Sequence, residues 1–189
     1  IETPKSGICH TVEEALAIAE EIGFPLVVRP AYTMGGQGGG FCYNKEELQT
    51  IVSNGLDLSL TRQCLIEESI LGWEELEVEV VRDSKNQMVA ICFIENIDAV
   101  GVHTGDSFCS APMLTISEEC QKRLQEQAYK IVDKVQVIGG TNVQFAHDPL
   151  SDRIIVIEIN PRTSRSSALA SKATGFPIAL VSAMLATGL

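Results

Sequence analysis

Hydrophobic and polar residues alternate most clearly in two stretches of the chain. Residues 75–80 (ELEVEV) alternate strictly between acidic and aliphatic side chains, which predicts a β-strand with one polar and one apolar face. Residues 154–160 (IIVIEIN) are rich in strong β-formers and end at Pro161, which has no backbone N–H, so they predict another strand. The expected faces of that strand are Ile155, Ile157 and Ile159 on one side and Val156, Glu158 and Asn160 on the other.

Helical spacing of apolar residues follows recognisable start signals. Thr11 and Glu14 form a capping-box pattern ahead of a helix expected over about 12–22, which Gly23 closes. Asn44 opens a second helix, expected to end near Ser53 because Asn54-Gly55 is a stop signal. Further helices are expected from Ser117 to about 135, after the hydroxyl-rich residues 163–167, and after Pro177.

Other apolar runs predict the remaining strands, over residues 24–29, 40–44, 64–68, 87–97 and 141–146. Gly139-Gly140 is expected to break the chain before the last of these. Asn142 and Gln144 should share one face of that strand, opposite Val143 and Phe145. The connection over residues 151–153 is short, which predicts an antiparallel hairpin that brings Gln144 close to Glu158.

Composition restricts the class of protein. The 189 residues are 45% hydrophobic and 21% charged, which is typical of a globular protein. The net charge of −11 disfavours a nucleic-acid or anionic-membrane partner, and no apolar run reaches the roughly 20 residues that span a bilayer. Six scattered cysteines without a C-x-x-C pair predict reduced thiols and a cytoplasmic location. The first residues lack both a signal-peptide pattern and an initiator methionine, so we expect a segment of a longer protein.

Residues 33–40 (TMGGQGGG) form a glycine-rich loop between two predicted strands. Glycine backbone lets N–H groups close upon phosphate oxygens, so the loop is interpreted as a phosphate-covering flap. It has neither the G-K-[ST] ending of a P-loop nor the G-x-G-x-x-G spacing. The alternative is a flexible linker without a ligand.

Candidate chemistry gathers at the end of the strand over residues 154–160. Glu158 and Asn160 offer hard oxygen ligands for Mg²⁺, and Arg162 offers a fork for an anion. The alternative is that Glu158 only forms an ion pair with Arg162. Arg165, at a helix start with exposed N–H groups, is a second candidate for holding an anion.

Three further candidates have plainer alternatives. Arg29 ends a short strand before Pro30 and is either a phosphate contact or a surface arginine. The acids in 75–80 are best interpreted as a solvated outer face, although Glu75 at the strand start is a candidate for a hydroxyl or cation contact. His103 lies in the polar loop 101–107, where a single histidine is more often structural than catalytic.

Three motifs carry a resemblance to a known family. They are the loop MGGQGGG over 34–40, the run from Glu95 through Asp98 to Ser107, and the segment NPRTSRSSALASKATG over 160–175. With them the whole chain resembles an ATP-grasp domain, and more narrowly the ATP-grasp domain of the carbamoyl-phosphate synthase large chain. The glycine loop and residues 165–169 are similar to the half that makes carboxyphosphate.

The resemblance implies an α+β fold of antiparallel sheets with packed helices and a glycine-rich flap between two strands. Residues of about 12–70 would form a small nucleotide-binding lobe, and about 71–189 a larger lobe with the metal and acceptor site. The implied nucleotide contacts are Arg29, Gly35, Gly36, Glu68, Ile70, Glu75, Gly101, His103, Gln144 and Glu158. The implied metal ligands are Gln144, Glu158 and Asn160, and the implied catalytic residues are Arg162, Arg165 and His103. Glu75 and Asn96 are candidates for a monovalent-cation site.

The implied activity is ATP-dependent phosphorylation of bicarbonate to carboxyphosphate, the first step of carbamoyl phosphate synthesis for pyrimidines and arginine. ATP, two Mg²⁺ or Mn²⁺ ions and K⁺ are the implied cofactors. Bicarbonate, ammonia, the rest of the large chain and a glutamine amidotransferase small chain are the implied partners. The family's preceding domain, which carries another phosphate-contacting arginine, is missing here, so we expect the isolated segment to be inactive. The alternatives are another ATP-grasp ligase such as biotin carboxylase, and a nucleotide-binding module without turnover.

Overall fold

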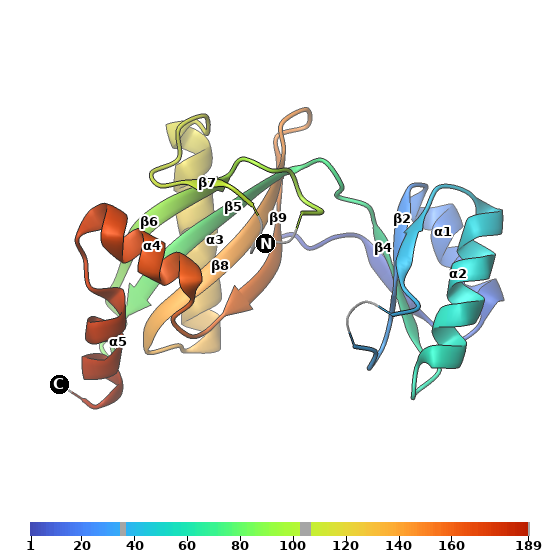
Figure 1. Ribbon diagram of the computed structural model, residues 1–189, viewed down its shortest axis with the longest axis horizontal. Helices are drawn as coiled ribbons and strands as arrows, with labels where there is room; N and C mark the ends of the chain where they lie inside the picture. The colour runs from blue at the N-terminus through green and yellow to red at the C-terminus, as the bar shows by residue number, and fades with distance from the viewer. Residues whose placement is uncertain (35–36, 103–106, 189) are drawn as a thin grey trace. The chain divides into compact units, whose positions relative to one another are not determined.

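The computed structural model describes residues 1–34, 37–102 and 107–188, and the chain divides into two compact units (Figure 1). The smaller unit is Pro4–Ile70, and the larger unit combines Ile1–Thr3 with Leu71–Leu189. Each unit has its own hydrophobic core built from one antiparallel sheet and the helices packed on it. Both units have the α+β organisation that the sequence predicts.

The smaller unit is a four-stranded sheet with two helices on one face (Figure 1). Its sheet order is β1-β4-β2-β3, and every pairing is antiparallel. Alternate strand residues point toward the helices and are completely buried, Leu26 and Val28 on β2 and Ile66 on β4 among them. The elements are β1 (Ser6–Cys9), α1 (Val12–Ile22), β2 (Leu26–Pro30), β3 (Gly40–Cys42), α2 (Lys45–Leu58) and β4 (Cys64–Glu68).

The predicted end of α2 at Ser53 is wrong, because the helix continues through Asn54-Gly55 to Leu58. A Cβ on Gly55 would lie 2.9 Å from Pro30 Cγ and 3.0 Å from Cys64 Sγ. The glycine therefore permits close packing of the helix on the sheet and does not end it. Strand β1 was not predicted, since it is held by pairing with β4, far away in the sequence.

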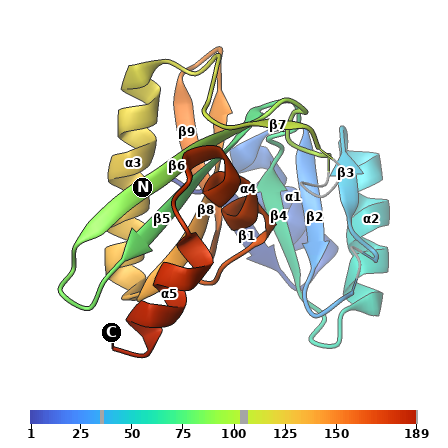
Figure 2. The same cartoon turned by 60° about the vertical axis from the view of Figure 1, so that its left-hand side comes forward.

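The larger unit is a five-stranded antiparallel sheet in the order β7-β6-β5-β8-β9. Helix α3 covers one face, while α4 and α5 lie on the other (Figure 2). The elements are β5 (Glu74–Arg82), β6 (Met88–Asn96), β7 (Cys109–Ser110), α3 (Glu118–Val135), β8 (Gly139–Asp148), β9 (Arg153–Asn160), α4 (Arg165–Thr174) and α5 (Ile178–Ala186). The α3 face holds the main core, in which Leu76 and Val78 of β5 pack with Leu124 and Val132 of α3.

The solvated outer face predicted for the acids of β5 is wrong. Glu75, Glu77 and Glu79 do point away from the α3 core, as the alternation predicts, but they are 6%, 5% and 0% exposed. The start of α4 packs over this face, and the Ser167 hydroxyl donates to Glu79 Oε2 at 2.8 Å. The polar face of the strand is therefore an interior polar layer.

The predicted faces of β9 are also partly wrong, because the strand contains a bulge. Gln144 lies opposite Glu158 and Phe145 lies opposite Val156, so Ile157 is an extra residue without a cross-strand partner. A single inserted residue reverses the alternation beyond it. As a result Val156 and Ile159 both pack on the α3 core, while Glu158 remains on the opposite face.

Gly139 and Gly140 begin β8 and do not break the chain before it. Gly139 has a φ of +102°, and a Cβ on Gly140 would lie 2.8 Å from Ser182 Oγ of α5, so both positions require glycine. All six cysteines are free, and Cys109 is the one that is exposed. Among the described residues no single helix has the length and apolar composition to cross a bilayer, although α4 and α5, bent by 115°, meet that test as a broken pair.

Candidate functional site

Two rows of polar side chains cross the sheet of the larger unit on the α4 face. The strand register places Glu77 opposite Gln144 and Gln144 opposite Glu158, which confirms the predicted hairpin. One step along the strands, Glu79 lies opposite Asn142 and Asn142 opposite Asn160. Cross-strand partners have their Cβ atoms about 5 Å apart, so each row is a continuous line of oxygen and amide groups.

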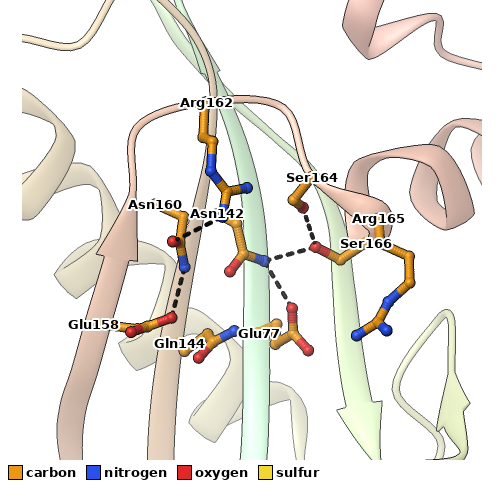
Figure 3. Close-up of a pocket in the computed structure, with 9 residues that line it drawn as sticks. All are labelled: Glu77, Asn142, Gln144, Glu158, Asn160, Arg162, Ser164, Arg165 and Ser166. Carbon is orange, nitrogen blue, oxygen red and sulfur yellow. Dashed lines mark hydrogen bonds between the residues drawn. The ribbon is translucent and has the colours of Figure 1, made fainter. Parts of the chain in front are cut away.

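All members of these rows except Glu79 form the floor of a cavity of about 270 Å³ (Figure 3). The loop after β9 and the first turn of α4 supply its other wall, including both candidate arginines. The sequence analysis identified Gln144, Glu158, Asn160, Arg162 and Arg165, and the structure brings all five together. The cavity is lined by Glu77, Asn142, Gln144, Glu158, Asn160, Arg162, Ser164, Arg165 and Ser166.

At the β9 end of the cavity the side chains are linked in series. Asn160 Nδ2 donates to Glu158 Oε1 at 2.8 Å, and Arg162 Nη2 donates to Asn160 Oδ1 at 3.4 Å (Figure 3). Arg162 Nη1 donates to the Thr163 carbonyl at 3.3 Å. Within the described chain no ion pair joins Glu158 to Arg162, so the simple pairing considered as an alternative is absent. The Arg162 side chain is exposed and can turn toward an anion in the cavity.

The sequence analysis did not assign Glu77, Glu79 or Ser166 to the site, although it placed Asn142 on the polar face of its strand and named Asn96 as a candidate for a cation site. Asn142 Nδ2 donates to Glu77 Oε2 at 2.7 Å, to Glu79 Oε1 at 2.9 Å and to Ser166 Oγ at 3.1 Å. On the other side, Asn96 Nδ2 donates to Glu77 Oε1 at 3.0 Å. The strict alternation of residues 75–80 was the available signal, but a period of two does not reveal which face is covered.

The carboxylates of this face repel one another. Burial raises the pKa of Glu75 to about 7, and the charges of Glu77 and Glu158 add to the increase. Burial also raises the pKa of Glu79, against the lowering effect of hydrogen bonds from Ser166, Ser167 and Asn142. Repulsion among carboxylates near a cavity is relieved by a cation, so the electrostatics favour binding one.

The first turn of α4 has a capping box made by two serines. Ser164 is the N-cap, its hydroxyl accepts the Ser167 N–H, and the Ser167 hydroxyl accepts the Ser164 N–H at 3.0 Å. Arg165 is the first residue of the helix and is exposed. It also lines a second cavity of about 260 Å³, together with Glu77, Ile94, Asn96, Ser107, Cys109, Ser166 and Leu169.

The donor set at the β9 end fits a magnesium-type ion. Glu158 offers a carboxylate, and Gln144 and Asn160 offer amide oxygens, which are the hard ligands that Mg²⁺ prefers. Among the described residues no group of three or more His, Cys, Asp or Glu side chains is placed to hold a metal. A metal in this cavity would therefore depend on the amides and on oxygen atoms of a bound substrate.

In the smaller unit, Arg29 lies on the sheet face that the helices leave uncovered. Its side chain is 63% exposed, and its Nε lies 2.8 Å from Glu67 Oε2. Arg29 also lines a cavity of about 400 Å³ with Val27, Val28, Pro30, Thr33, Gly39, Gly40 and Phe41. Glu68 ends β4, where its backbone N–H donates to the Lys5 carbonyl at 2.8 Å, and Ile70 ends the unit.

Three predicted site residues lie outside the described residues: Gly35, Gly36 and His103. Gly101, just before the second gap, has a φ of +118°, and a Cβ there would lie 2.6 Å from Leu71 Cδ1. The positive φ favours glycine at position 101, whereas the Leu71 side chain, which is 49% exposed, has room to move away from a Cβ.

Comparison with known sequences identifies one family. Residues 1–189 match the family described as "Carbamoyl-phosphate synthase L chain, ATP binding domain". The chain is 54% identical over 189 residues to the carbamoyl phosphate synthase large chain of Archaeoglobus fulgidus and 52% identical to that of Xanthomonas axonopodis pv. citri. Each alignment covers all of this chain and 18% of the relative, so the chain spans less than a fifth of those proteins.

Solved structures show the same fold at low identity. A biotin carboxylase from Campylobacter jejuni, described as a β-γ-ATP complex, superimposes with a TM-score of 0.82 at 20% identity, covering 99% of this chain and 43% of that one. The biotin carboxylase domain of a Hydrogenobacter thermophilus 2-oxoglutarate carboxylase gives a TM-score of 0.80 at 22% identity, covering 100% and 42%. The predicted ATP-grasp fold is confirmed.

Proposed function

Because this chain belongs to the family of the ATP-binding domain of the carbamoyl-phosphate synthase large chain, we propose that it is part of an ATP-dependent ligase that phosphorylates bicarbonate. The observation that carries the proposal is the cavity in which a row of carboxylate and amide oxygens faces two arginines, Arg162 and Arg165. Oxygen ligands suit the cations that accompany nucleotide phosphates, and arginines suit a small planar oxyanion. The product would be carboxyphosphate, which ammonia then converts to carbamate.

In the proposed reaction a bicarbonate oxygen attacks the γ-phosphorus of ATP, the bond from that phosphorus to the β–γ bridging oxygen breaks, and ADP leaves with the bond electrons. Such transfers depend mainly on positioning and on neutralising charge, so no side-chain nucleophile is required. Arg162 and Arg165 would hold the bicarbonate and stabilise the negative charge that develops on the transferring group. Both arginines line the same cavity as the oxygen ligands, which suits an acceptor that lies next to the terminal phosphate.

Glu158, Gln144 and Asn160 would hold Mg²⁺ or Mn²⁺, which neutralises phosphate charge when it is bound. Glu75 and Asn96 would hold a monovalent cation such as K⁺, and the repulsion between Glu75 and the charges of Glu77 and Glu158 supports a cation beside it. His103 would lie near the phosphates. The proposed nucleotide contacts are Arg29, Gly35, Gly36, Glu68, Ile70, Glu75, Gly101, His103, Gln144 and Glu158.

We assign the chain to the carboxyphosphate-forming half of a large chain, on the basis of its glycine loop and residues 165–169. Residues 71–189 would be the lobe with the metal and acceptor site, and the preceding residues the nucleotide-binding lobe. The proposed partners are the rest of the large chain and a glutamine amidotransferase that supplies ammonia. The proposed setting is the cytoplasm, in pyrimidine and arginine biosynthesis.

The fold is shared with biotin carboxylase domains, which makes a biotin-dependent ligase the second candidate. ATP hydrolysis by the full-length protein that carries this segment should be measured with and without bicarbonate, and with and without biotin. We expect that ATP hydrolysis requires bicarbonate and that its rate does not change when biotin is added. Stimulation by biotin would assign the chain to the second candidate, and nucleotide binding without hydrolysis would make it a binding module.

A further inference from the structure

Glu79 is completely buried beneath the start of α4, where amide and hydroxyl groups donate to its carboxylate. Its Oε1 accepts hydrogen bonds from Asn142 Nδ2 at 2.9 Å and Ser166 Oγ at 2.6 Å, and its Oε2 accepts one from Ser167 Oγ at 2.8 Å. Ser164 Oγ lies 3.5 Å from Oε1. We name these five residues the Glu79 cluster. Through these hydrogen bonds one side chain of β5 is linked to β8 and to three residues at the start of α4.

The Glu79 cluster includes residues next to the two arginines of the proposed acceptor site. Ser164 is two residues after Arg162 and is the N-cap of α4, and Arg165 lies between Ser164 and Ser166. The hydroxyls that bind Glu79 therefore fix the backbone on both sides of Arg165 and the end of the loop that carries Arg162. Glu79 itself does not line the cavity, whereas both arginines do.

We propose that Glu79 is a positioning residue. It holds the start of α4 in the position from which Arg162 and Arg165 bind the acceptor anion. This inference rests on the function proposed above. A purely structural role is the competing explanation, but it gives no reason for a carboxylate. A buried charge pays a desolvation penalty, and an apolar side chain of similar size would often serve stability as well. The carboxylate is explained by its capacity to accept several hydroxyl and amide hydrogens at once.

The test uses the full-length protein with the variants Glu79→Gln and Ser167→Ala, and with Val132→Ala as a control. Glutamine keeps the size of Glu79 but replaces one acceptor oxygen with a donor. Ser167→Ala removes one donor to Glu79 and also the capping-box acceptor of the Ser164 N–H. Val132 is buried in α3 on the opposite face of the same sheet, so its truncation destabilises the unit without touching the cluster. The KM for bicarbonate, kcat and hydrogen exchange of the amides of residues 164–168 are measured.

We expect Glu79→Gln to raise the KM for bicarbonate at least about tenfold, since small displacements of gripping residues have large kinetic effects. Ser167→Ala should give a smaller rise, and exchange should become faster in residues 164–168 in both variants. Val132→Ala should leave the KM unchanged. The proposal is overturned if Glu79→Gln changes neither the KM nor the exchange, or if Val132→Ala raises the KM as much as Glu79→Gln does.

If the wild-type protein shows no bicarbonate-dependent hydrolysis, the proposed function fails, and so does the part of the inference that concerns the acceptor anion. Hydrogen exchange then tests the remaining part, that Glu79 holds the start of α4. Faster exchange confined to residues 164–168 in Glu79→Gln then supports it. Unchanged exchange overturns it.

Discussion

Glu75→Gln should stabilise the larger unit relative to wild type, and this gain in unfolding free energy should be larger at alkaline pH than at acidic pH. Glu75 is 6% exposed, and its pKa is raised from 4.5 to about 7, mainly by burial and then by the charges of Glu77 and Glu158. An acid with a raised folded-state pKa stabilises the fold below its unfolded pKa and loses that contribution as the pH rises through the folded pKa. The full shift corresponds to about 3 kcal/mol.

Glutamine does not ionise, so the variant keeps the contribution that wild type loses between pH 4.5 and 7. The difference in unfolding free energy between variant and wild type should therefore grow by about 2–3 kcal/mol from pH 5 to pH 8. Comparing the two proteins at each pH cancels the titration of the groups that do not interact with Glu75. Any fixed cost of placing an amide at this position is the same at both pH values and also cancels.

The assay is urea unfolding followed by fluorescence of Trp73. This is the single tryptophan of the chain, and it lies beside β5, so it reports on the larger unit. Chelator and tetramethylammonium salts keep metal cations away from Glu75. Glu126→Gln, at an exposed acid of α3, is the matched control and should show no comparable growth. A difference that stays constant from pH 5 to pH 8 for Glu75→Gln would refute the reasoning about burial and carboxylate repulsion.

Three further predictions concern activity. In the full-length protein, Glu158→Gln and Gln144→Ala should each reduce bicarbonate-dependent ATP hydrolysis by at least about tenfold, because the metal site loses a charge or a ligand. The circular dichroism spectrum should stay unchanged, and near-normal turnover at saturating Mg²⁺ would contradict the metal assignment. Arg162→Lys should reduce kcat/KM for bicarbonate about tenfold or more, since lysine cannot replace a bidentate fork; unchanged kinetics would give Arg162 a structural role. The 189-residue chain alone should fold but make no carbamoyl phosphate, given that it spans 18% of its relatives; detectable product would contradict this.

Local sequence patterns predict most of the helices and strands and bring several candidate site residues together. Thr11, Asn44 and Ser117 cap α1, α2 and α3 as their side-chain chemistry predicts. The apolar periodicity located most strands, and the short connection after β8 fixed the pairing of Gln144 with Glu158. These features depend on neighbours within a few residues, so the sequence contains the information that defines them.

The burial of the polar face of β5 depends on tertiary contacts. Alternation in β5 shows that its two faces differ, but it does not show which face is covered. Helix α4 follows more than 80 residues later, covers the acids and supplies hydrogen bonds to Glu79. The bulge at Ile157 is likewise invisible in a run of isoleucines, because it depends on the register with β8. Strand β1 and the close packing of Gly55 depend on partners that are also distant in sequence. Burial and register are set by such long-range contacts, and local sequence patterns do not specify them.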